Sequence, residues 1–147
     1  MDITDVRIKL MPDPGDRLLA FCSITLGRCF VVRDLKIIEG ENGRFIAMPS
    51  RKLMVRCPAC SNKNSLRARF CDLCGKPLEP SDGQTQSANG RPKLYADIAH
   101  PISAKCRRAL EEQVLKAYEL ELEKAKEPDY VCRYEDYGEE NFATAAE

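Results

Sequence analysis

Two pairs of cysteines in the middle of the chain limit its possible folds more than any other feature. Each pair has the spacing Cys-x-x-Cys and ten residues separate the pairs, which consist of Cys57, Cys60, Cys71 and Cys74. This spacing is typical of a zinc ribbon, in which each pair forms a tight turn and four thiolates hold a tetrahedral ion. Gly75 follows the second pair and can take the left-handed conformation there. We therefore expect one structural Zn²⁺, because four protein ligands leave no open position for catalysis.

Two disulfides are the alternative interpretation of these cysteines, and they require an oxidising compartment. The N-terminus, Met1 to Asp5, lacks the basic start and apolar stretch of a secretion signal. No apolar run approaches the roughly 18 residues of a membrane span. We therefore expect a cytoplasmic protein without a membrane segment, which favours zinc. The remaining cysteines are interpreted as small apolar fillers, namely Cys22, Cys29, Cys106 and Cys132.

Charge is unevenly distributed along a chain whose formal net charge is zero. The last segment, 127–147, carries seven acidic residues and one basic residue, Arg133. The segment 51–76 carries seven basic residues and one acidic residue, Asp72. Basic ribbons of this kind often bind phosphate groups. The alternative is that these charges form an ordinary solvated surface that keeps a small domain soluble.

The first fifty residues show β-strand patterning. Val6, Ile8 and Leu10 alternate with basic residues, and alternation resumes from Leu18 to Leu26. Further strands are expected at 30–38, with a bulge near Arg33 and Asp34, and at 45–48, after a hairpin turn at 40–43. This pattern predicts an antiparallel meander of four or five strands.

One helix is expected near the end of the chain. Ser103 is a suitable N-cap, and apolar residues recur at helical spacing from Cys106 to Leu122, which predicts a helix to about Lys126. The fold class is therefore α+β, with a small antiparallel sheet, a C-terminal helix and an inserted zinc ribbon. The expected parts are a core (1–52 and 94–125), the ribbon (53–78), a flexible linker (79–93) and an acidic tail (126–147) in which Tyr130, Val131, Tyr134, Tyr137 and Phe142 could dock.

Several sequence blocks resemble the SpoVG family of bacterial septation regulators (stage V sporulation protein G). They are the N-terminal Asp5-Val6-Arg7, then Val32–Gly40, Gly43–Lys52 and Asp97–Ile102. These blocks lie within two matching parts, 1–52 and 94–125, which cover 84 of the 147 residues in family order. The resemblance implies a small sheet with a C-terminal helix, a homodimer, and binding of DNA and RNA in regulation. The chain departs from the family pattern by the ribbon and linker, which replace a short loop, and by the acidic tail.

The start of the expected helix is unusually basic, with no acid before Glu111. Cations at this end oppose the helix dipole by about 0.3 to 1 kcal/mol each, whereas the free amides there can bind phosphate. Arg51 and Lys52, which leave the last core strand, form a second basic cluster. The candidate nucleic-acid contacts are Arg51, Lys52, Arg67, Arg69, Lys105, Arg107 and Arg108, and ordinary surface charge is the alternative.

The favoured function is a dimeric, nucleic-acid-binding regulator of the SpoVG type, linked to septation, whose ribbon adds a second contact surface. The alternative is a protein-interaction adaptor, in which the ribbon binds a protein and the acidic tail mimics or blocks nucleic acid. An enzyme is not expected. His100 is the one histidine, but nothing in the sequence orients it toward Cys106 as a catalytic pair.

Overall fold

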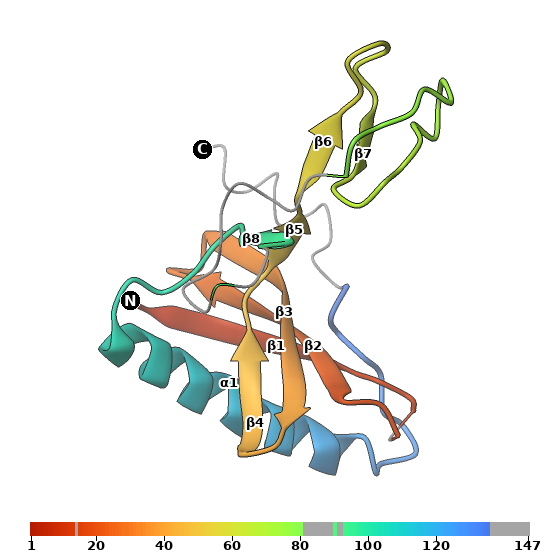
Figure 1. The fold of residues 1–147 in the computed structure, drawn as a ribbon. Coiled ribbons are helices and arrows are strands. Elements are labelled where there is room, and N and C mark those ends of the chain that lie inside the picture. Colours follow the sequence, from red (N-terminus) through yellow and green to blue (C-terminus); the bar gives the residue numbers. More distant parts are fainter. Residues whose placement is uncertain (14, 81–89, 91–92, 136–147) are drawn as a thin grey trace, which may run out of the picture. The chain divides into compact units, whose positions relative to one another are not determined.

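The structure is a computed structural model that describes residues 1–13, 15–80, 90 and 93–135 (Figure 1). The chain divides into two compact units. The core unit comprises Met1–Pro49 and Ala99–Glu147, and the ribbon unit comprises Ser50–Ile98. Most of the predicted linker and the end of the predicted acidic tail, with Tyr137 and Phe142, lie outside the described residues.

The core unit contains a four-stranded antiparallel sheet. Its strands are paired in chain order, β1 (Ile3–Leu10), β2 (Leu18–Leu26), β3 (Phe30–Gly40) and β4 (Gly43–Ala47). Gly27 and Arg28 connect β2 to β3 with φ angles of 55° and 59°. This conformation suits the right-handed twist of a hairpin. At the β3–β4 hairpin the positive φ, 111°, belongs to Gly43 rather than to the preceding Asn42. The predicted antiparallel meander is confirmed.

A β-bulge interrupts β3 where the sequence predicts one. Cys22 pairs with Leu35 and Ile24 pairs with Val32, so β3 has one extra residue between these positions. Asp34 lies in this interval with a φ of 63°, a left-handed conformation that aspartate tolerates better than most residues. The bulge restores the inward orientation of Leu35, which is fully buried.

A single described helix, α1 (Ala104–Lys124), lies across one face of the sheet (Figure 1). The hydroxyl of Ser103 accepts a hydrogen bond from the amide of Cys106 at 3.2 Å, which confirms the predicted N-cap. The helix ends at Lys124, two residues before the predicted end. No helix in the described part of the chain combines the length and apolarity needed to cross a membrane.

The hydrophobic core lies between the sheet and α1. Alternate residues of the strands contact residues spaced by four on the helix, as the two periodicities predict. The buried cluster consists of Ile8, Ala20, Cys22, Ile24, Leu35, Ile37, Ile46, Leu110, Val114 and Tyr118. Burial raises the pKa of the Cys22 thiol to about 12, consistent with an inert apolar filler. Cys29 and Cys132 are exposed, so the expectation that they are fillers is wrong.

The ribbon unit consists of two short antiparallel pairs. β5 (Ser50–Lys52) pairs with β8 (Tyr95–Asp97), and β6 (Met54–Arg56) pairs with β7 (Lys63–Ser65). Arg51 and Lys52, expected at the end of a core strand, therefore lie in a two-stranded pair of the ribbon unit.

Candidate metal centre and nucleic-acid interface

The four predicted zinc ligands converge in the ribbon unit. The four sulfur atoms lie within 4.8 Å of one another, and all four cysteines are free thiols. The sulfurs of Cys57 and Cys74 are 3.7 Å apart, and those of Cys60 and Cys71 are 3.6 Å apart. A tetrahedral ion with Zn–S bonds of about 2.3 Å requires S–S separations of about 3.8 Å. The four cysteines can therefore hold a metal ion, and their spacing suits the dimensions of Zn²⁺.

Two equivalent turns build the cluster. In the first turn, the amide of Ser61 donates to the carbonyl of Cys57 at 2.9 Å, and in the second the amide of Gly75 donates to Cys71 at 3.0 Å. Ser61 and Gly75 both have positive φ angles, 64° and 75°. The left-handed conformation predicted for Gly75 is confirmed. Ser61 takes the same conformation without the freedom of glycine, and its residue type offered no signal for this.

The turns also direct amides at the sulfurs. The backbone N–H of Cys60 lowers the pKa of the Cys57 thiol. The backbone N–H of Cys74, together with the Asn64 side chain, lowers the pKa of the Cys71 thiol to about 6. In each case the last cysteine of a pair donates to the first. The backbone N–H of Asn62 lowers the pKa of the Cys60 thiol, but burial and the neighbouring cysteine side chains outweigh it and raise that pKa to about 12. Stabilised thiolates are the form of cysteine that binds a metal, so the turns prepare the site for a cation.

Asn64, in β7, supports the metal site through its buried side chain. It is only 2% exposed. Its amide nitrogen donates to the sulfur of Cys71 at 3.4 Å, and its oxygen accepts from the backbone N–H of Asp72 at 3.0 Å. The side chain thus holds both a ligand and the turn that follows it. Nothing in the sequence indicates this role of Asn64, because a polar residue in a short strand gives no sign of burial.

Basic side chains are exposed along the ribbon unit. All seven basic residues of the segment 51–76 are exposed: Arg51, Lys52, Arg56, Lys63, Arg67, Arg69 and Lys76. Among the residues that the structure describes, none of the seven forms an ion pair. In the core unit, Arg7, Arg33 and Arg44 are in ion pairs, whereas Lys9 and Lys36 are in none within the described residues.

The basic helix start belongs to the core unit. Lys105, Arg107 and Arg108 are exposed in the first turns of α1, which contain no acidic residue before Glu111. Arg107 reaches Glu111 at 3.4 Å, one turn further along. This exposed i,i+4 pair is worth only a few tenths of a kcal/mol, so it leaves the guanidinium available. Arg51 and Lys52 lie in the ribbon unit, and their contact with nucleic acid stays a prediction.

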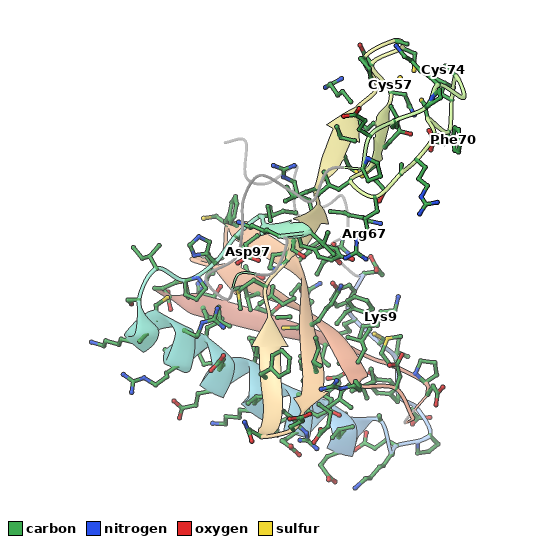
Figure 2. All side chains as sticks on the ribbon, viewed as in Figure 1. Lys9, Cys57, Arg67, Phe70, Cys74 and Asp97 are labelled. Atoms are coloured by element: carbon green, nitrogen blue, oxygen red, sulfur yellow. The ribbon has the colours of Figure 1, made fainter. Side chains whose placement is uncertain are left out.

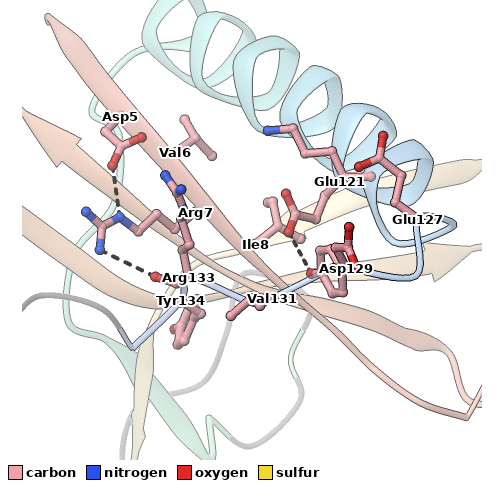
Figure 3. A pocket seen from close by; sticks show the side chains of 12 residues that line it. Asp5, Val6, Arg7, Ile8, Glu121, Glu127, Asp129, Val131, Arg133 and Tyr134 are labelled. Atoms are coloured by element: carbon pink, nitrogen blue, oxygen red, sulfur yellow. Dashed lines mark hydrogen bonds and ion pairs between the residues drawn. The ribbon is translucent and has the colours of Figure 1, made fainter.

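The segment after α1 docks on the core unit through Tyr130 and Tyr134, two of the residues for which the sequence allowed docking. The Tyr130 hydroxyl donates to Glu121 at 2.6 Å, and Arg7 donates to the carbonyl of Arg133 at 3.4 Å. Between these contacts, the Cys132 thiol lies 3.7 Å from the Ile8 carbonyl of the edge strand β1. A polar pocket of about 430 Å³ lies along this path (Figure 3). We refer to 127–135 as the C-terminal strap.

Tyr134 anchors the strap at the bulge of β3. Its side chain is 3% exposed, and its hydroxyl oxygen lies 3.3 Å from both the amide nitrogen and the carboxylate of Asp34. The Arg33 guanidinium lies 5.3 Å from the ring centroid and forms an ion pair with Glu135 at 2.6 Å. Burial raises the pKa of the Tyr134 phenol. The bulge therefore forms a socket for one aromatic side chain of the strap.

An apolar groove of about 250 Å³ lies on the core unit beside the helix start. Its lining includes Val32, Leu35, Pro101, Ile102 and Cys106. His100 also lines it, with its Nδ1 atom 3.3 Å from the Pro101 carbonyl.

The fold and the site together define a small α+β protein, a four-stranded sheet with one helix, into which a four-cysteine ribbon is inserted. The family model named SpoVG matches residues 1–120, so the chain belongs to the SpoVG family.

Individual relatives extend this match. A protein of Bdellovibrio bacteriovorus is 37% identical, with 83% of this chain and 77% of the relative covered. A protein of Myxococcus xanthus is 36% identical, with 86% and 88% covered. A protein of Finegoldia magna is 36% identical, with 99% and 95% covered. Each is named "Putative septation protein SpoVG".

Proposed function

We propose that this protein is a nucleic-acid-binding regulator of the SpoVG type, linked to septation, and that it binds rather than transforms its target. The observation that carries the proposal is the set of seven exposed cations in the segment 51–76 of the ribbon unit, none of them in an ion pair within the described residues. Unpaired cations on a rigid frame can contact phosphates and release counterions on binding. The basic start of α1 supplies a further contact, because its amides and side chains favour an anion.

A structural zinc ion fits this role. It would hold the two turns of the ribbon together in a segment with few buried apolar residues, among them Leu66. The cations would then lie on a backbone that is already folded, so binding would not require a further loss of backbone conformational entropy at each phosphate contact.

A protein-interaction adaptor is the second candidate. Leu73 and Met54 of the ribbon unit are 71% and 45% exposed, and exposed apolar side chains are common in protein interfaces. The two candidates differ in their response to salt, because only phosphate contacts give affinity a steep dependence on salt concentration.

The deciding experiment is a binding series with random-sequence DNA and RNA at several salt concentrations. Each phosphate contact contributes about 0.9 to the slope of log affinity against log salt on duplex DNA, and about 0.7 on single strands. Replacing both Arg107 and Arg108 with alanine should flatten the slope by roughly 1 to 2 units, with helix content kept or slightly raised.

A matched control removes two exposed cations elsewhere on the same helix, Lys116 and Lys124. This double alanine variant should keep the wild-type slope. If the Arg107/Arg108 variant binds with unchanged affinity and slope, the helix start is not part of the site. If the wild-type protein shows no salt-dependent binding at all, the adaptor function is favoured.

A further inference from the structure

We infer that the ribbon unit binds single-stranded nucleic acid, with an unpaired base stacked on Phe70 and with Arg67, Arg69 and Lys76 beside its backbone. The inference rests on the proposed function, since it names the form of nucleic acid and the residue that selects it. Its support comes from three features of the ribbon: an exposed aromatic ring, a rigid backbone that carries it, and the charges next to it.

Phe70 is exposed in a position where burial would be ordinary. The residue after it, Cys71, is a buried zinc ligand, and nearby Leu66 is buried as well. The Phe70 side chain nevertheless is 63% exposed and stands out from the ribbon (Figure 2). It therefore contributes little to the packing of this unit, and its ring presents a π-face to solvent.

The backbone around Phe70 is held on both sides. The amide of Cys71 donates to the carbonyl of Lys76 at 2.9 Å, and the amide of Leu78 donates to Arg69 at 2.7 Å. Phe70 itself forms a β-bridge with Pro77. With Cys71 also held by the metal site, the ring sits on a fixed platform. A preorganised platform loses less conformational entropy when a partner stacks on it.

The neighbouring charges suit a phosphate backbone. Arg67 and Arg69 precede Phe70 by three residues and one residue, and Lys76 lies opposite Cys71 across the hydrogen-bonded turn. All three side chains are exposed and, within the described part of the chain, none has an ion-pair partner. A positively charged surface that carries an exposed aromatic side chain is the combination by which proteins bind single strands, stacking bases while neutralising phosphates.

Single strands are favoured over duplex by the same features. Bases within a duplex are already stacked on each other, so an aromatic side chain gains a stacking partner only when a base is unpaired. Duplex readout usually places a helix or a longer β-ribbon in the major groove. The described residues of the ribbon unit contain no helix, and β6 and β7 have three residues each.

The absence of tryptophan from the sequence permits a direct test. The variant Phe70→Trp, in the zinc-loaded full chain, places a single tryptophan at the proposed stacking position. Adding a single-stranded oligonucleotide, either oligo(dT) or oligo(rU), should quench its fluorescence, because stacking on a base brings the indole into contact with it. A duplex of the same length should produce little quenching. The matched control is Phe30→Trp in the core unit, since Phe30 is 62% exposed, and it should remain unquenched.

Affinity supplies the second measurement. The variant Phe70→Leu keeps an apolar side chain of similar size but removes the π-face, so single-strand binding measured by anisotropy should weaken about 5- to 100-fold. Duplex binding should change less than twofold. Zinc content equal to that of wild type would show that the ribbon still folds.

The outcomes separate this inference from the proposed function. If the oligonucleotide binds but Phe70→Trp is not quenched, or Phe70→Leu binds single strands like wild type, stacking on Phe70 is wrong and the proposed function stands. Equal quenching of Phe30→Trp and Phe70→Trp also overturns the assignment. If wild type binds neither single strands nor duplex, both proposals fail, and exposed Phe70 is left as a contact for a protein partner.

Discussion

Asn64 is the residue on which the arrangement of the metal site depends most outside the cysteines. Because it donates to Cys71 and accepts from Asp72, it links a ligand to the turn behind it. Asn64→Ala should weaken zinc binding about 10- to 100-fold, the usual effect of losing a partner of a metal ligand. Competition with a chromophoric chelator measures this directly.

Asn62→Ala is the matched control for this prediction. The amide nitrogen of Asn62 lies 4.0 Å from the Cys71 sulfur, which is farther than that of Asn64, and Asn62 is only half-buried. Asn62 donates to the side chain of Asp72, whereas Asn64 accepts from the Asp72 backbone N–H and so holds the turn itself. The zinc affinity of Asn62→Ala should therefore fall less than that of Asn64→Ala. Equal losses in both variants would show that the contact of Asn64 with the ligand has no special role.

Tyr134 is the residue that anchors the C-terminal strap at the bulge of β3. Tyr134→Ala removes a buried ring from the Asp34 socket and should lower the free energy of unfolding of the core unit by about 3 kcal/mol. Urea denaturation, followed by a signal of the core unit, measures the change. Tyr95→Ala, in the exposed β8, should change stability by no more than about 0.5 kcal/mol. If Tyr134→Ala and Tyr95→Ala have equal free energies of unfolding, the strap is not docked in solution.

At the scale of elements, the ribbon and the sheet are stabilised by different means. The sheet and α1 share a hydrophobic cluster, whereas the ribbon has few buried side chains beyond its cysteines, Leu66 and Asn64. Metal binding energy in such a segment is folding energy. Elemental analysis of freshly purified, reduced protein should therefore find one zinc per chain.

Cys60→Ser tests this division between the two elements. The variant should lose zinc and unfold the ribbon, while amide resonances of the core sheet keep their positions in a ¹H–¹⁵N spectrum. Cys29→Ser changes an exposed cysteine of the core unit and should keep the zinc. A Cys60→Ser protein that retains one zinc with wild-type affinity would contradict the four-cysteine assignment.

At the scale of the whole molecule, we expect a homodimer built by the core unit. The sheet is small, and β4 pairs only with β3 among the described strands, so its outer edge is open to a second copy. The apolar groove beside the helix start adds exposed apolar surface, with Ile102 94% exposed. The edge strand β1 is less available, because the strap passes along it.

Sedimentation at micromolar concentration measures the assembly. Wild type should sediment with the mass of a dimer, and so should Cys60→Ser, because the ribbon is not needed for a dimer formed by the core. A monomer mass for the wild-type chain would count decisively against this prediction.

Local sequence determined much of this protein. Alternation in 6–10 and 18–26 predicted strands, Ser103 predicted the start of α1, and the spacing of four cysteines predicted their convergence. The bulge at Asp34 was also predictable. These features could be inferred because each depends on residues close together in the chain, where periodicity, capping and turn geometry act.

Only the tertiary structure decided the rest. Local sequence patterns could not predict the hydrogen bond from Asn64 to Cys71. They also could not predict that Tyr134 packs against Arg33 and Asp34. Tyr134 and Asp34 are a hundred positions apart, and burial of a polar or aromatic group depends on what the rest of the chain brings to it. The exposure of Phe70 likewise could not be predicted from local sequence. A phenylalanine beside a buried cysteine predicts packing, and only the folded ribbon leaves its ring in solvent.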